Sequence, residues 1–121
     1  GGELSRLMLA LQRVLAGSTK TGTLVFDEID SGVGGRLGDA IGEKLKQIGR
    51  DHQVLCVTHL PQVACHGTRH IRVIKAMEGE QTRTCIEEVS GDQRIQELAM
   101  MLRGDRATER SVAEASEMLE E

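Results

Sequence analysis

Apolar residues recur along this chain with more than one period, and the changes of period predict where helices and strands lie. Between residues 4 and 15 they recur every three or four positions, which is typical of a helix with one apolar face, and this run ends near Gly17. The same spacing predicts a second helix that ends near Gly49, with one face formed by Leu37, Ile41, Leu45 and Ile48.

Two short runs are apolar at nearly every position and lie between turn-forming stretches. They are residues 23 to 26 (Thr-Leu-Val-Phe) and residues 53 to 58 (Gln-Val-Leu-Cys-Val-Thr). Runs of this kind are typical of strands that helices bury on both faces. Because a predicted helix separates them, we expect the two strands to be parallel, with a right-handed crossover. The predicted fold class is α/β, with parallel core strands flanked by helices.

The second half of the chain predicts a β-hairpin and two helices. Residues 71 to 76 and 82 to 89 read as strands, with Gly79 in the turn between them. The two helices should lie across the sheet or the hairpin, and their end signals are Ser90 or Asp92, Gly104 and Thr108. Pro61 predicts the start of a further short helix. With no repeat and no low-complexity linker, we expect no internal domain boundary.

Two adjacent carboxylates and a histidine follow the predicted parallel strands. Asp27 and Glu28 come directly after the first strand, and His59 comes directly after the second. The carboxyl ends of parallel strands meet at one sheet edge, which is where α/β proteins bind ligands. Asp27 could hold a hydrated Mg²⁺ of a nucleotide, Glu28 could deprotonate the attacking water, and His59 could sense a phosphate. An acidic turn and a structural histidine are the plain alternatives.

Glycines mark two further stretches. The turn at residues 30 to 35 (Asp-Ser-Gly-Val-Gly-Gly) has three glycines and could follow another surface closely. Gly1 and Gly2 open the first predicted helix, where free N–H groups favour an anion, although a flexible chain end explains them equally well. If Lys20 is aligned with the lysine of a phosphate loop, the stretch at residues 17 to 22 (Gly-Ser-Thr-Lys-Thr-Gly) lacks the first glycine of that loop. It also precedes a strand, so we reject it as a phosphate loop.

Composition narrows the function classes. The chain has 121 residues, a net charge of −4 and one aromatic residue, Phe26, so neither a basic footprint nor a base-stacking platform for DNA is visible. We expect a cytoplasmic protein, since nothing resembles a signal peptide and no apolar run approaches the ~20 residues of a membrane span. Three cysteines without a CxxC pair fit a reducing compartment. Cys65, His66 and His70 raise a zinc question, but a fourth ligand at a usual spacing is missing.

The ordered set GGE, TLVFDEID, SGVGG and VTHLPQVA resembles the second half of an ABC-type ATPase head. The order corresponds to signature motif, Walker B, D-loop and switch histidine, and within that superfamily it is most similar to the SMC-like RecN family of bacterial DNA repair proteins. The resemblance implies a partial P-loop NTPase fold. It also implies that residues 1 to 121 form the C-terminal lobe of a head, without the Walker A lobe and the coiled coil.

The resemblance implies roles for individual residues. Asp27 would be the Mg²⁺-associated aspartate, Glu28 the general base and His59 the switch histidine. Cofactor-binding positions would be the signature residues Gly1, Gly2 and Glu3 and the D-loop residues Ser31, Gly32, Val33 and Gly34. The serine expected before the signature glycines is not in this sequence, and Gly34 stands where many ABC proteins have an aspartate.

The function implied by the resemblance is ATP hydrolysis, with ATP and Mg²⁺, in repair of DNA double-strand breaks and recombination. The implied partners are the Walker A lobe of the same protein, a second head in a homodimer and DNA, with no membrane. The implied location is the bacterial cytoplasm, with association to the nucleoid on DNA. Two alternatives stay open, namely a non-catalytic dimerisation or protein-docking module and the head lobe of another SMC-like protein.

Overall fold

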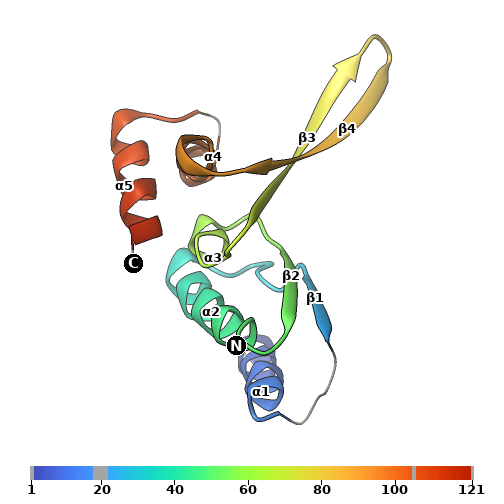
Figure 1. Cartoon of the computed structure of the whole chain (residues 1–121), viewed down its shortest axis with the longest axis vertical. Coiled ribbons are helices and arrows are strands. Elements are labelled where there is room, and N and C mark those ends of the chain that lie inside the picture. Colours follow the sequence, from blue (N-terminus) through green and yellow to red (C-terminus); the bar gives the residue numbers. More distant parts are fainter. Residues whose placement is uncertain (1, 18–21, 105, 121) are drawn as a thin grey trace. The chain divides into compact units, whose positions relative to one another are not determined.

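The computed structural model describes residues 2–17, 22–104 and 106–120, with side chains from Leu7 onward. The chain divides into two compact units, Gly1–His66 and Gly67–Glu121, each with its own buried residues (Figure 1). The boundary near His66 was not expected from the sequence, because no change of composition and no flexible linker marks it. Among the described residues, no helix is long and apolar enough to cross a membrane.

The first unit is built around two parallel strands. Its elements are, in chain order, α1 (Gly2–Leu15), β1 (Thr23–Asp27), α2 (Gly35–Ile48), β2 (Gln53–Val57) and α3 (Pro61–Ala64). The strands β1 and β2 pair in parallel, with Thr23 opposite Gln53 and Asp27 opposite Val57. This confirms the predicted β-helix-β arrangement and places the ends of both strands at one edge.

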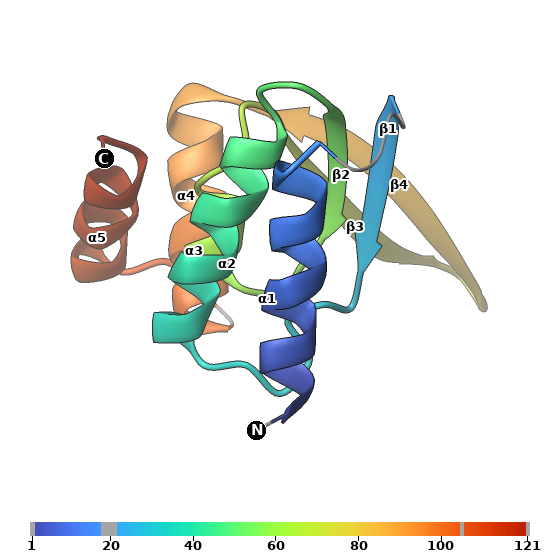
Figure 2. The same ribbon diagram turned by 90° about the horizontal axis from the view of Figure 1, so that it is seen from below.

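The helices α1 and α2 lie together on one side of the strand pair (Figure 2). The buried core consists of Leu11, Ile41, Leu45, Ile48 and Val63, and the inward residues of both strands, Leu24, Phe26, Val54 and Cys56, pack against it. Leu37, which was predicted to share this apolar face, is instead exposed, because it lies in the first turn of α2, before the buried stretch of the helix.

The opposite face of the strand pair is open and apolar. Its residues Val25, Leu55 and Val57 are 66%, 48% and 60% exposed. The prediction that both faces of these strands are buried is therefore wrong for this unit. The continuous apolar pattern shows that both faces of the strands are apolar, but the helices of this unit cover only one of them.

Two glycines let α3 approach α2 closely. A Cβ atom added at Gly38 would meet Leu60 Cδ1 at 3.0 Å, and one added at Gly42 would overlap His66 Cδ2 and meet the carbonyl oxygen of Gln62 at 3.0 Å. Both glycines therefore serve close packing of the two helices. The contact fixes α3 directly after the segment that carries His59.

We expect Gly42→Ala to destabilise the first unit by about 1–3 kcal/mol, because the new methyl group overlaps the His66 ring. This loss outweighs the gain of ~1 kcal/mol that alanine brings to a helix. Thermal unfolding followed by circular dichroism measures the change. His66→Ser provides the matched background, since removing the ring should make Gly42→Ala clearly less destabilising and leave only the tight contact with the Gln62 carbonyl oxygen. Equal destabilisation in both backgrounds would contradict the packing explanation.

The second unit begins with the long hairpin of β3 (His70–Glu78) and β4 (Gln81–Val89). The strands are antiparallel, and Gly79, with φ +64°, lies in the turn as predicted. Both strands are longer than the sequence pattern predicted, because pairing continues to Glu78 opposite Gln81. Much of the hairpin extends away from the helices of its unit (Figure 1), and Val73, Met77 and Ile86 are exposed.

The helices α4 (Gly91–Arg103) and α5 (Glu109–Glu120) pack against each other, with Leu98, Ala99 and Ala115 buried. The end of α4 at Gly104 is confirmed by φ +88°, and its N–H donates to the carbonyl of Met100. Thr108 caps α5 as predicted, because Ser111 N–H donates to Thr108 Oγ1 at 3.2 Å. Ser90 lies at the N-cap of α4 but makes no side-chain cap hydrogen bond.

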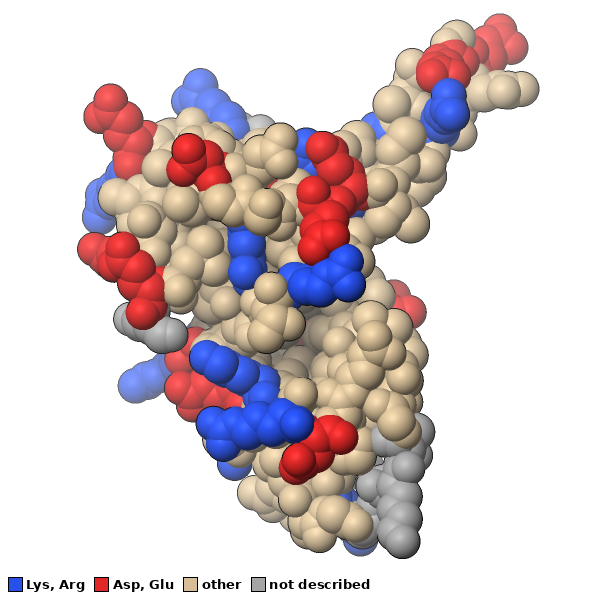
Figure 3. Space-filling model, in the orientation of Figure 1, with Lys and Arg blue, Asp and Glu red and all other residues tan. Residues whose placement is uncertain are grey.

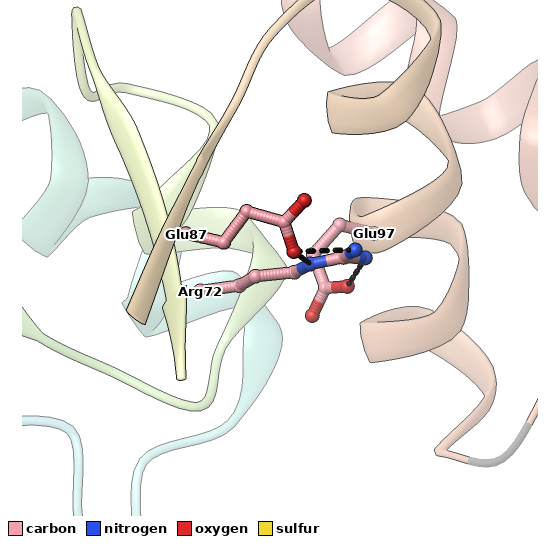
Figure 4. A network of polar contacts seen from close by, with 3 residues as sticks. All are labelled: Arg72, Glu87 and Glu97. Carbon is pink, nitrogen blue, oxygen red and sulfur yellow. Dashed lines mark hydrogen bonds and ion pairs between the residues drawn. The ribbon is translucent and has the colours of Figure 1, made fainter. Parts of the chain in front are cut away.

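Ion pairs join the base of the hairpin to α4. Arg72 on β3 donates to Glu87 on β4 at 2.9 Å and to Glu97 on α4 at 3.3 Å (Figure 4).

The neighbouring His70 is buried, and burial together with Arg94 and Arg72 lowers the pKa of its imidazole, although Glu97 opposes the shift. His70 is therefore neutral at physiological pH, which suits its place beside two arginines.

Candidate functional site

The candidate site lies at the carboxyl edge of β1 and β2. Asp27 is the last residue of β1 and is opposite Val57, the last residue of β2. Glu28 follows β1, and Thr58 and His59 follow β2. The side chains of Asp27, Glu28 and His59 are exposed to solvent. The strand register thus brings Asp27, Glu28 and His59 to one edge of the strand pair, as the sequence predicted.

Glu28 has a strained backbone. Its φ of 58° is in the left-handed region, and it is the one non-glycine residue with positive φ among the described residues. A side chain in this region costs about 1–2 kcal/mol, and such residues cluster at functional sites. The positive φ of Glu28 follows directly on Asp27, the last residue of β1, and the strand ends there.

Asp30 is the centre of a polar cluster that sequence reasoning missed. Its side chain is 2% exposed, and its Oδ2 atom accepts hydrogen bonds from the Thr58 hydroxyl and, at 3.1 Å, from the His59 N–H. The same oxygen lies 3.4 Å from Nδ1 of His59. Thr58 Oγ1 in turn accepts the Leu60 N–H at 3.0 Å. His59 therefore contacts Asp30, which lies three residues after Asp27, the predicted Mg²⁺ ligand.

The glycine-containing loop forms two successive turns between β1 and α2. Ser31 N–H donates to the Glu28 carbonyl at 3.3 Å, and Val33 N–H donates to the Asp30 carbonyl at 3.0 Å. Gly32 has φ +72°, a conformation that favours glycine. Ser31, Gly32 and Gly34 are exposed, whereas Val33 packs against the core. The loop thus presents polar and glycine positions to solvent and is anchored by one valine.

The first helix carries the start of the predicted signature segment. Gly2 and Glu3 are the first residues of α1, whereas Gly1 lies outside the described residues. Residues 18 to 21 of the rejected phosphate-loop stretch also lie outside them.

The cysteine and histidine residues that raised a zinc question have other contacts. His66 Nε2 lies 2.9 Å from Asp39 Oδ1, and Cys65 Sγ lies 3.5 Å from the Gln62 carbonyl. His70 belongs to the second unit. Across the part of the chain that the structure describes, no three or more histidine, cysteine or acidic residues gather as a metal site would require.

The acidic edge also affects Cys56 on β2. Burial, followed by the charges of Asp30 and Asp27, raises the pKa of the Cys56 thiol to about 11. Cys85 on the hairpin is exposed. The two thiols therefore differ in reactivity, since the thiolate is the nucleophile and Cys56 is almost fully protonated at neutral pH.

We expect a thiol reagent such as iodoacetamide at pH 8 to modify Cys85 at least ~10-fold faster than Cys56. Mass spectrometry of peptides from partly modified protein measures the two rates. Asp30→Asn removes one of the two charges and should speed modification of Cys56 while leaving Cys85 unchanged. Comparable rates at both cysteines in the parent protein would contradict the assigned environment of Cys56.

Comparisons with known proteins agree with the motif order. The chain is 47% identical over 119 residues to the DNA repair protein RecN of Treponema pallidum, 45% over 120 residues to that of Streptomyces coelicolor and 36% over 121 residues to that of Bacillus subtilis. These alignments cover 98% to 100% of this chain but only 21% of each relative, so the chain spans about one fifth of the proteins it matches. No family model matches the chain.

A solved structure from work on ATP-driven dimerization and DNA-stimulated activation of SMC ATPases has a similar fold. The TM-score is 0.62 at 16% sequence identity, over 84% of this chain and 58% of that chain. At this identity the likeness supports the fold, and it confirms the predicted partial SMC-type head fold with parallel strands, hairpin and two last helices. By sequence similarity along 98% to 100% of its length, the chain matches one segment of the RecN family of DNA repair proteins, and its fold is similar to part of an SMC-type ATPase head.

Proposed function

We propose that this lobe supplies the hydrolytic half of an ATP site in a RecN-type protein that acts in DNA double-strand break repair. The observation that carries the proposal is the convergence of Asp27, Glu28 and His59 at the carboxyl edge of a parallel strand pair. Each has the chemistry that phosphoryl transfer to water requires, because a carboxylate can hold Mg²⁺, a second can accept the proton of water and an imidazole can contact phosphate.

The described residues at this edge fit Mg-ATP. Asp27 and Glu28 are both exposed, so that a hydrated metal ion and a water molecule can reach them. Asp27 would hold Mg²⁺, which supplies charge neutralisation for the phosphates. Glu28 would orient and deprotonate the attacking water, and His59 would contact the terminal phosphate. The loop of Ser31, Gly32, Val33 and Gly34 and the signature residues Gly1, Gly2 and Glu3 would contact nucleotide across a pair of heads.

The site needs groups that these 121 residues do not contain. The sequence has no G-x-x-x-x-G-K-[ST] phosphate loop. We infer that the Walker A lobe supplies the phosphate cradle and that a second head completes each site. DNA would be engaged through the full-length protein, since the lobe itself has interspersed charges of both signs on the face shown in Figure 3 and a net charge of −4. From this role we also propose that the protein is cytoplasmic and associates with the nucleoid on DNA.

The competing function is a non-catalytic docking module that uses the same fold. The exposed residues Val25, Leu55 and Val57 would suit it, because an open apolar sheet face favours a partner. The strained Glu28 beside Asp27 favours the catalytic function, since a docking surface has no need of a carboxylate held at positive φ. Another SMC-like head is disfavoured by the identity to RecN proteins over nearly the whole chain.

The experiment that separates these functions mixes the chain with a separately produced Walker A lobe of the same protein. The catalytic proposal predicts association that strengthens at least ~10-fold with Mg-ATP, because the nucleotide binds groups from both lobes. Isothermal titration calorimetry with and without Mg-ATP measures it, and Mg-ADP is the control. Association of equal strength in all three conditions would favour the docking module.

A further inference from the structure

Asp30 links two loops of the candidate site through one side chain and its own backbone. Its Oδ2 atom accepts the Thr58 hydroxyl and the His59 N–H, and it faces Nδ1 of His59 at 3.4 Å. Its carbonyl oxygen accepts the Val33 N–H at 3.0 Å. A single residue thus fixes both the segment that follows β2 and the loop that follows β1.

The burial of Asp30 shows that this arrangement is specific. At 2% exposure, it is the one buried carboxylate among the residues that the structure describes. Burying a carboxylate is unfavourable unless hydrogen-bond donors satisfy it, and here the donors come from Thr58 and His59, 28 and 29 residues away in sequence. The His59 side chain, in contrast, is 68% exposed, and among the described residues its ring has no other hydrogen-bond or ion-pair partner.

We propose that Asp30 is a positioning residue for His59, and this inference rests on the proposed role of His59 in contacting phosphate. A carboxylate that faces Nδ1 favours the tautomer with its proton on Nδ1. It also restricts the ring to one orientation, so that Nε2 is turned away from Asp30 and is available to a ligand. Thr58 completes the device, because its hydroxyl donates to Asp30 and accepts the Leu60 N–H.

The catalytic test is a double-mutant cycle in the full-length protein. We expect Asp30→Ala to lower kcat by ~10²-fold, the scale of misplacing a catalytic group by about 1 Å, with little change in KM for Mg-ATP. Asp30→Asn keeps a neutral acceptor oxygen and should lower kcat less. In a His59→Ala background, neither substitution should lower kcat further, because a positioning residue has nothing left to position.

A second readout does not depend on activity. In the 121-residue chain labelled with ¹⁵N-histidine, long-range nitrogen–proton spectra report the tautomer of each ring, and the His59→Ala spectrum identifies the His59 signals. We expect the Nδ1-protonated tautomer in the parent chain and a shift toward the Nε2-protonated form in Asp30→Ala. Circular dichroism monitors folding, and if Asp30→Ala unfolds, Asp30→Asn provides the same comparison with a smaller shift.

The outcomes separate this proposal from the proposed function. If His59→Ala leaves hydrolysis at the parental rate, the role of His59 in the proposed function fails, while the tautomer of His59 still tests its link to Asp30. If His59→Ala slows hydrolysis but Asp30→Ala lowers kcat equally in both backgrounds, Asp30 acts independently of His59 and the positioning proposal is overturned. An unchanged His59 spectrum in folded Asp30→Ala overturns it as well.

Discussion

Substituting Glu28 by glutamine in the full-length protein is expected to lower ATP turnover by ~10²–10⁴-fold, the range for losing a positioned general base. Mg-ATP binding should be retained, because the amide keeps the size and polarity of the side chain. Stability should be unchanged, since Glu28 is exposed and glutamine has the same backbone strain as glutamate at φ 58°. Steady-state phosphate release and equilibrium nucleotide binding measure the two effects.

A matched control separates the position from the loss of charge. Glu43 is an exposed glutamate on α2 in the same unit, and Glu43→Gln removes the same charge away from the carboxyl edge. We expect it to hydrolyse ATP at the parental rate. Asp27→Asn should act differently from Glu28→Gln, because it should raise the Mg²⁺ concentration needed for activity. A parental rate in Glu28→Gln would show that Glu28 is not the general base.

The strained backbone of Glu28 gives the same experiment a second arm. Glycine accepts positive φ without the cost of about 1–2 kcal/mol that other residues incur. It also loses about 0.5–1 kcal/mol more entropy on folding. Because these terms oppose each other, Glu28→Gly should leave thermal stability nearly unchanged or slightly raised while turnover is lost. If Glu28 served only to form the turn, Glu28→Gly would have the slightly raised stability without any loss of turnover.

The sequence predicted the elements of this chain well because their signals are local. The helical period of α1 and α2, the apolar runs of β1 and β2, and the cap at Thr108 each depend on neighbouring residues. The parallel pairing followed from chain order and handedness. Asp27 and His59 therefore came to one edge as expected.

The features that the sequence did not predict depend on distant partners. Asp30 was assigned to the turn because aspartate before serine and glycine is typical of one. Its burial depends on the Thr58 hydroxyl and the His59 N–H, which only the folded strand pair brings within reach. Likewise, an apolar run cannot say which of its two faces is covered, and Val25, Leu55 and Val57 remain open for that reason.

The 121-residue chain on its own is expected to bind Mg-ATP weakly or not at all and to show no turnover above background. Hydrolysis depends on a phosphate cradle that positions the terminal phosphate against the carboxylates, and the sequence contains no such loop. Removing a preorganised set of donors costs several orders of magnitude in rate. Phosphate release by the purified chain, compared with the Glu28→Gln chain as the blank, measures this directly.

The same chain is also expected to self-associate through the open face of its strand pair. Val25 and Leu55 are opposite each other in the register and are 66% and 48% exposed, next to Val57 on the same face. A contiguous apolar surface of this kind recruits another chain when its cover is missing. Light scattering should show a mass above 13.2 kDa that rises with concentration.

Threonine substitutions test whether this face is responsible. Val25→Thr and Leu55→Thr keep strand propensity but make the face polar, so they should lower the average mass without loss of the folded state. Val73→Thr, at an exposed hairpin position, is the matched control and should leave association through the strand pair unchanged. Robust turnover by a strictly monomeric parent chain would overturn both the half-site argument and the rejection of residues 17 to 22 as a phosphate loop. Monomeric chain without turnover would refute the open face as an association surface and leave the half-site argument standing.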